Sequence, residues 1–220
     1  MINLNEFFWL APRSKAEEPI FNELLGDLYR RIPANILASL VLGPLLAFIM
    51  SKSVEAERAA LWLVILLAAQ FLAFLLAFKF NRRVDDSEAG DKKWPYLLGL
   101  TVIVDGIAWG LAGPLLFTEQ YPQYQMILIL FIIVGAAAAT ITFASWLGVA
   151  LTYIAVILTP GVITLLNAEW DTYRFLGWAG LVFGFVLFGL AATSNHTITR
   201  MLKLRFDNER LVENLSESHT

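Results

Sequence analysis

Asp105 is the residue of this chain with the clearest capacity for chemistry, because it is the one carboxylate inside a long apolar stretch, residues 97–117. Such a stretch is long enough to cross a bilayer, and Asp105 would then lie near its middle. An ionised carboxylate is costly there, so it should be protonated, paired or facing a wet cavity. No lysine or arginine occurs in the central part of any apolar stretch of the chain to pair with it.

Trp109 follows Asp105 by four residues and therefore shares its face on a helix. The polar residues of the apolar stretches that could meet Asp105 are Gln70, Thr101, Thr140, Thr142, Ser145, Thr152, Tyr153 and Thr159. The predicted pocket for a small amphipathic ligand consists of Asp105, Trp109, Thr140 and Tyr153. An equally supported alternative is that Asp105 only bonds a neighbouring hydroxyl or carbonyl and holds helices together. Gln70 is interpreted as an interhelical contact.

Other chemistry lacks the residues that it needs. The chain has no cysteine, which excludes thiol nucleophiles, disulfides and iron–sulfur clusters. Its two histidines, His196 and His219, lie outside the centres of the apolar stretches, and no cluster of metal ligands is present. We expect no catalytic residue, metal or cofactor in this chain. The net charge of −3 and the lack of a basic stripe also exclude a nucleic-acid partner.

The composition predicts an all-α, polytopic membrane protein, because 58% of the residues are hydrophobic and only 16% are charged. About a quarter of the residues are charged in a soluble domain, and about 20 apolar residues span a bilayer. Six transmembrane helices are predicted at roughly 32–51, 60–80, 97–117, 125–144, 148–167 and 175–194. The fourth and fifth are joined by the short link ASWLG and should form an antiparallel hairpin.

Small residues and a proline shape the third predicted span. Gly106, Gly110 and Gly113 allow close helix approach, either within one bundle or between subunits. Pro114 should free a backbone carbonyl and bend the helix near its outer end.

The distribution of lysine and arginine predicts the orientation in the membrane. With both termini on the cytoplasmic side, that side holds thirteen of the sixteen basic residues, and the opposite side holds only Lys52, Arg58 and Arg174. Basic residues near spans collect on the cytoplasmic side. An even number of spans is needed to return the chain to the same side, and six satisfies this requirement.

A short amphipathic helix is predicted before the first span, over residues 17–31. Its apolar face carries Phe21, Leu24, Leu25 and Leu28. Pro33 should mark the start of the next element. We expect this helix to lie on the cytoplasmic leaflet, as a simple anchor or as a sensory element.

The C-terminal segment predicts a parallel dimer. An a/d seam with spacings of three and four residues is formed by Met201, Leu204, Asn208, Leu211 and Leu215. Asn208 occupies an a position, where a buried asparagine favours one register of a parallel dimer. No proline or glycine occurs after Gly189, so the sixth span should continue into the seam. The alternative is an amphipathic end that lies on the membrane.

Three stretches carry a resemblance to a known group of signalling proteins: DLYRRIPANILASL (27–40), DGIAWGLAGPLLF (105–117) and LRFDNERLVENL (204–215). In order and spacing they resemble the N-terminal six-helix membrane sensor region of bacterial GGDEF diguanylate cyclases and of sensor or hybrid histidine kinases. The resemblance covers most of residues 20–215. It implies a homodimer in the bacterial inner membrane whose last helix leads to a cytoplasmic output domain. No GGDEF signature or phosphoacceptor segment is present, and the family position of Asp105 is usually small and apolar.

Two functions follow from these features. The first is a sensory and dimerisation module that passes a membrane or small-ligand signal through the sixth span to a cyclase or kinase. The second is a small proton- or cation-coupled transporter that uses Asp105. The expected organisation is an N-terminal segment (1–31), a transmembrane sensor domain (32–194) and a signalling helix (195–220) that leads to an output domain outside this chain.

Overall fold

The computed structural model describes residues 18–83 and 93–218, and within these ranges the chain is helical without strands. The helices are α2 (Glu18–Met50), α3 (Ala56–Arg83), α4 (Lys93–Gly110), α5 (Ala112–Leu116), α6 (Pro122–Thr142), α7 (Leu147–Leu166) and α8 (Asp171–Ser218). Six segments, with α4 and α5 forming one of them, are long and apolar enough to cross a membrane. The predicted all-α class and the presence of six segments of membrane-spanning length are therefore confirmed.

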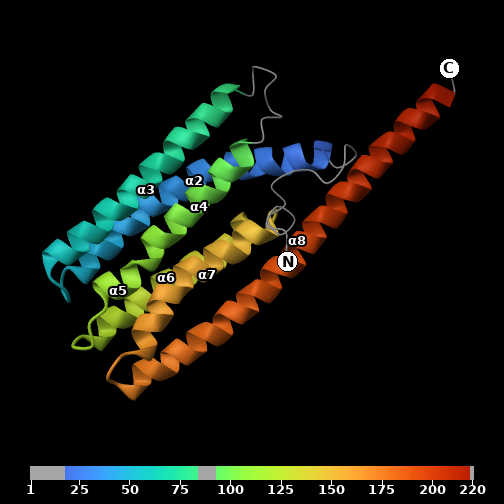
Figure 1. Ribbon diagram of the computed structural model, residues 1–220. Coiled ribbons are helices and arrows are strands. Elements are labelled where there is room, and N and C mark those ends of the chain that lie inside the picture. The colour runs from blue at the N-terminus through green and yellow to red at the C-terminus, as the bar shows by residue number, and fades with distance from the viewer. Residues whose placement is uncertain (1–17, 84–92, 219–220) are drawn as a thin grey trace.

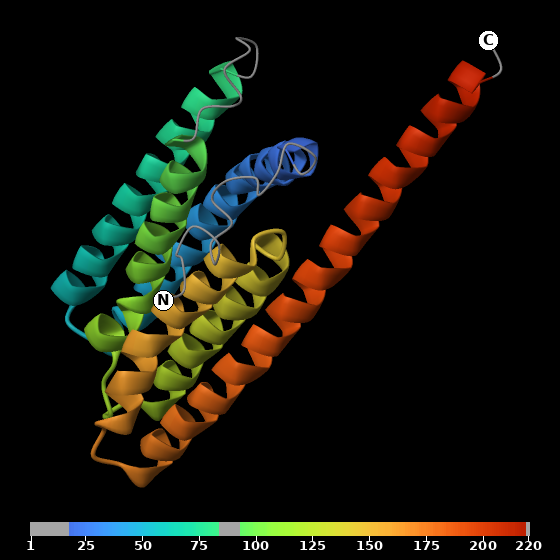
Figure 2. The same cartoon turned by 45° about the vertical axis from the view of Figure 1, so that its right-hand side comes forward.

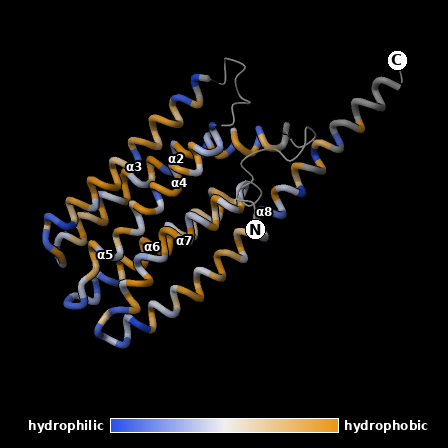
Figure 3. The backbone as a smooth tube through the Cα atoms, in the orientation of Figure 1, coloured by the Kyte–Doolittle hydropathy of each residue, from blue (hydrophilic) through white to orange (hydrophobic). Residues whose placement is uncertain are grey.

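The long helices run alternately up and down in one bundle (Figures 1 and 2). The α2–α3, α5–α6 and α7–α8 connections lie at one end of the bundle, which we call the turn end. The α6–α7 connection and the start of α2 lie at the opposite end, which we call the tail end because α8 extends beyond it. Apolar residues predominate along the helices and hydrophilic residues gather at the turns (Figure 3).

The predicted separate helix over 17–31 is wrong, because α2 runs without interruption from Glu18 through Pro33 to Met50. A proline removes one backbone hydrogen bond, and neighbouring helices in a membrane bundle can compensate for that loss. The first half of α2 is bent relative to the second half (Figure 1).

The apolar face at the start of α2 is covered by protein. Phe21, Leu24, Leu25 and Leu28 are all buried. The Phe21 ring lies 5.5 Å from the ring of Trp146 in the α6–α7 connection. Tyr29 stacks on Phe80 at 3.7 Å and donates a hydrogen bond of 3.1 Å to the carbonyl of Trp94. This face therefore packs on the tail end of the bundle, where we had expected it to lie on lipid.

Glycines bring α4 and α5 against α7. A Cβ atom at Gly110 would lie 2.7 Å from the carbonyl oxygen of Val156, and one at Gly113 would lie 2.6 Å from the Cα atom of Gly161. The small-residue face of the third span is thus used within one bundle. The expected break is also present: α4 ends at Gly110, whose carbonyl receives no backbone hydrogen bond from Pro114.

Helix α8 is anchored at both ends of the bundle, and farther along it Arg205 donates a hydrogen bond of 3.2 Å to the Glu23 carboxylate near the start of α2. At the turn end, the Glu119 carboxylate accepts hydrogen bonds from the backbone N–H groups of Glu169 (2.7 Å) and Trp170 (3.1 Å). At the tail end, the Asn195 side chain donates to the carbonyls of Ala144 (2.9 Å) and Ser145 (3.1 Å). From Asn195 to its last residue α8 extends for about 35 Å, at about 1.5 Å per residue. The predicted continuity of the sixth span with the C-terminal helix is confirmed.

Candidate functional site

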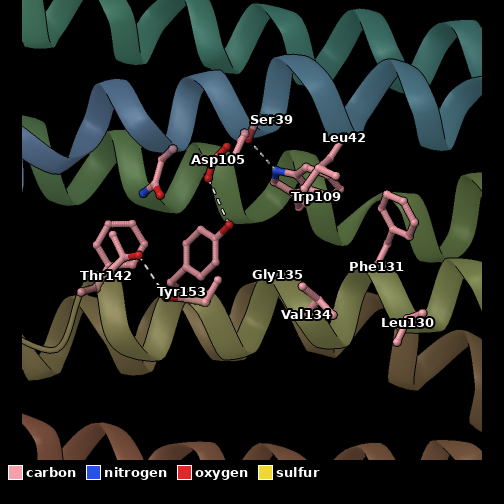
Figure 4. Close-up of a pocket in the computed structure, with 15 residues that line it drawn as sticks. Ser39, Leu42, Asp105, Trp109, Leu130, Phe131, Val134, Gly135, Thr142 and Tyr153 are labelled. Atoms are coloured by element: carbon pink, nitrogen blue, oxygen red, sulfur yellow. Dashed lines mark hydrogen bonds between the residues drawn. The ribbon is translucent and has the colours of Figure 1, made fainter.

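Asp105 joins three helices of the bundle. Its Oδ1 atom accepts a hydrogen bond from the Gln70 amide on α3. Its Oδ2 atom accepts one from the Tyr153 hydroxyl on α7 at 3.1 Å, which Figure 4 shows as a dashed line. Both donors are neutral. Since they bond opposite oxygens, they fix the orientation of the carboxylate while part of the side chain remains exposed.

The residues beside Asp105 make room for this arrangement. A Cβ atom at Gly106 would lie 3.2 Å from the Tyr153 ring, so the glycine lets the ring approach α4 closely. Phe143 packs on the same ring with centroids 5.2 Å apart. Tyr153 is therefore buried and held with its hydroxyl toward Asp105.

Trp109 is fixed by residues of α2 and α3. Its indole N–H donates to the Ser39 hydroxyl at 3.3 Å (Figure 4), and its ring meets the edge of Trp62 at 5.7 Å. Trp62 in turn donates a hydrogen bond of 2.9 Å to the carbonyl of Ala108. The wall that Trp109 provides is thus rigid.

Asp105, Trp109 and Tyr153 line one cavity of about 230 Å³ between α2, α4, α6 and α7 (Figure 4). Most of its wall is apolar. The polar side chains that reach it are those of Asn35, Ser39, Asp105, Trp109, Thr142 and Tyr153. This composition, an apolar wall with a few polar groups, is that of a small-molecule site.

A second cavity touches Asp105 from another side. It is about 30 Å³, about the size of one or two waters, and Gln70, Thr101 and Asn35 contribute polar groups to it. Asp105 therefore lines both cavities, together with Asn35 and Phe143.

The large cavity opens sideways between α2 and α6. Leu42 on α2 is 36% exposed, and Leu130 and Val134 on α6 are 57% and 53% exposed, while all three line the cavity. All three lie within the apolar segments Phe21–Met50 and Pro122–Thr142, which are long enough to cross a membrane. The opening therefore lies along the apolar length of the bundle and not at either end.

Three of the four predicted pocket residues come together, and one does not. Thr140 is buried, bonds back to the carbonyl of Ala136 on its own helix at 3.2 Å, and does not line the cavity. Thr142 on the same helix lines it instead. Sequence reasoning missed Asn35 and Ser39, although two polar residues four apart in an apolar stretch share a helical face.

The residues predicted for dimerisation lie on the part of α8 that follows Asn195. Met201, Leu204, Asn208 and Leu211 are exposed in the single chain. Leu215 belongs to the same helix, but its side chain is outside the described residues.

Within residues 18–83 and 93–218 no group of three potential metal ligands occurs. His196 is exposed on α8, and His219 lies outside the described residues. Comparison of the chain with protein-family models, curated proteins and solved structures finds no match. The fold and the site define the class of helical, multi-pass membrane proteins with a side-opening apolar cavity.

Proposed function

We propose that the chain is the sensory and dimerisation module of a bacterial signalling protein of the inner membrane. A small amphipathic ligand occupies the cavity at Asp105, and α8 transmits the change to a cytoplasmic cyclase or kinase. The observation that supports this most directly is the unbroken α8, which crosses the bundle and continues past its tail end. The basic residues of the sequence favour placing that end in the cytoplasm.

One exposed side of α8 favours a second copy as its partner. The exposed residues along it are Val182, Val186, Leu190, Thr193, Thr197, Met201, Leu204, Asn208 and Leu211. From Val182 to Leu204 the spacing of four, four and three residues occurs twice, and Asn208 and Leu211 follow at four and three residues, which keeps the series on one side of the helix. The stripe thus runs from the apolar part of α8 into the predicted dimer seam.

The contacts of α7 supply a route from the cavity to α8. Tyr153 of α7 bonds Asp105, and the following turns of α7 pack on α8. A Cβ atom at Gly180 would lie 3.0 Å from Val162, and one at Gly184 would lie 3.4 Å from Leu158. Because this contact is close, a displacement of α7 by ligand changes the packing of α8.

The mechanism is a population shift between two arrangements of α7 and α8. A ligand shifts such an equilibrium only by its difference in affinity for the two states. The ligand contacts Tyr153 differently in the two arrangements, and this contact gives the difference in affinity. The hydrogen bonds at Glu119 and Asn195 restrict the movement of α8 to rotation or tilt.

Single cysteines at Leu204 and Leu211 test this coupling, because the chain has no cysteine of its own. We expect Ala138→Phe, at the mouth of the cavity, to change the ratio of the two crosslinking rates in membranes by about fivefold, the low end of typical coupling. Ile141→Phe, exposed on the same helix but outside the cavity, is the matched control. Equal ratios in both variants contradict the coupling.

The second candidate, a proton- or cation-coupled transporter, is favoured by one observation: Asp105 touches both cavities. The test is proton or cation uptake by liposomes that contain the chain. Uptake that is lost in Asp105→Asn would support the transporter function and contradict the sensor function.

A further inference from the structure

We infer that the cavity at Asp105 takes a lipophilic ammonium compound, such as a long-chain primary amine, that enters from the bilayer between α2 and α6. This inference rests on the proposed function in that it names the ligand class of the same site. It follows from the charge, the walls and the opening of the cavity.

The charge of the cavity selects against anionic heads. Asp105 is the only charged residue among the described residues that line it, and neither lysine, arginine nor histidine contributes to its wall. A carboxylate or phosphate head would meet Asp105 without a cation to balance it.

The bonding of Asp105 leaves room for a donor from the ligand. A carboxylate has about four acceptor positions. Among the described residues, the Gln70 amide and the Tyr153 hydroxyl each donate to one of them. The residue is partly exposed and lines the cavity. An ammonium head supplies up to three N–H donors and the missing positive charge.

The aromatic walls fit the same chemistry. Trp109, Phe131, Phe143 and Tyr153 all line the cavity. A cation within about 6 Å of an aromatic face is attracted by its electron density, most strongly by tryptophan. The attraction grows where water is excluded, as in this apolar cavity.

The size and opening of the cavity fit an amphiphile rather than a compact solute. Pockets that bind whole drug-sized ligands measure about 300–1,000 Å³. The cavity, about 230 Å³, holds a head and its first carbons. Leu42, Leu130 and Val134 at the mouth are exposed and apolar, so the rest of the tail can remain in the hydrocarbon.

Binding of radiolabelled dodecylamine to the full chain in nanodiscs tests the inference, with empty nanodiscs correcting for partition into lipid. We expect saturable binding that Asp105→Asn weakens by about tenfold or more, as for loss of a bond to a charged group. Unlabelled dodecanoate and dodecanol should compete far less well than dodecylamine. Equal competition by dodecanoate or dodecanol, or equal binding by Asp105→Asn, overturns the inference.

Two variants that leave Asp105 untouched protect the test from a folding defect. Ala138→Phe narrows the mouth and should weaken binding, whereas Ile141→Phe, exposed outside the cavity, should not. Equal binding by these two variants also overturns the inference. If the chain binds the amine but α8 crosslinking does not change, the sensor proposal is overturned and the inferred ligand class is retained. If Ala138→Phe changes α8 crosslinking but the chain binds no amine, the ligand class is overturned and the sensor proposal is retained.

Discussion

At the scale of single residues, two neutral donors around Asp105 explain how a carboxylate can lie inside the bundle without a counter-ion. Gln70 and Tyr153 come from α3 and α7, so the same bonds that hold Asp105 also join three helices. The two roles left open by the sequence, interhelical contact and binding residue, are therefore compatible.

Removal of the Tyr153 hydroxyl should have a small but measurable cost. Hydrogen bonds between membrane helices contribute about 0.6 kcal/mol on average and about 1.7 at most. We expect Tyr153→Phe to lower the free energy of unfolding by about 1 kcal/mol, measured by reversible unfolding in bicelles.

Thr152→Val is the matched control for this substitution. The Thr152 hydroxyl bonds only the carbonyl of Gly148 on its own helix, at 2.8 Å. Its loss should cost less than that of Tyr153. An equal or greater cost for Thr152→Val would show that the bond to Asp105 does not join the helices.

Asp105 and Trp109 could be predicted from the sequence, because a carboxylate in an apolar stretch is conspicuous and a spacing of four residues fixes a shared face. Thr140 could not be assigned in this way, since a threonine hydroxyl can bond the preceding turn of its own helix and then needs no partner. The side of each helix that faces the cavity is decided by the packing of the whole bundle. The pattern of α2 alone therefore did not show that Ser39 lines the cavity.

At the scale of helices, the pattern of apolar residues predicted where the long helices lie. It did not predict whether lipid or protein contacts each apolar face. The apolar face at the start of α2 has the spacing of a lipid-facing helix and of a protein-facing one. Tyr29 distinguishes the two, because its bond to the carbonyl of Trp94 and its stacking on Phe80 require partners far away in the sequence. The apolar pattern of one helix contains no information about these distant partners.

The contact of α4 with α7 should be intolerant of a single added methyl group. In Gly110→Ala the new Cβ atom would lie 2.7 Å from a backbone oxygen, which cannot rotate away. We expect a loss of about 1–3 kcal/mol in the free energy of unfolding, typical of overpacking.

Gly99→Ala, on the same helix, controls for helix propensity. A Cβ atom there has no neighbour within 4 Å, so alanine should be neutral or stabilising by up to about 1 kcal/mol. Similar losses in Gly99→Ala and Gly110→Ala would contradict the close approach of α4 and α7.

The anchor of α8 at the tail end should be separable from the rest of the helix. Asn195→Ala removes both bonds to the α6–α7 connection. We expect faster amide hydrogen exchange in α8 after residue 195, without faster exchange in α4, in a detergent-solubilised sample.

Thr197→Ala is the control for this substitution, because its hydroxyl bonds only the carbonyl of Thr193 on α8 itself, at 3.0 Å. Faster exchange in both variants to the same extent would mean that Asn195 does not anchor the helix.

At the scale of the whole molecule, the chain is a bundle with one long helix extending from its tail end. Met201, Leu204 and Leu211 on that extension are 65%, 56% and 59% exposed. Burial of one such side chain from water contributes about 1.5–3 kcal/mol. Pairing of two copies along this stripe, as proposed above, would hide these residues.

Disulfide crosslinking of a single cysteine at Leu211, in membranes, is the most direct test of this account. Phe206, about 140° around α8 from Leu211 at about 100° per residue, is half-buried and provides the control position. We predict rapid crosslinking between two chains at Leu211 and little at Phe206. Crosslinking that is absent at Leu211, or equally fast at both positions, would contradict the paired α8 on which the sensor depends.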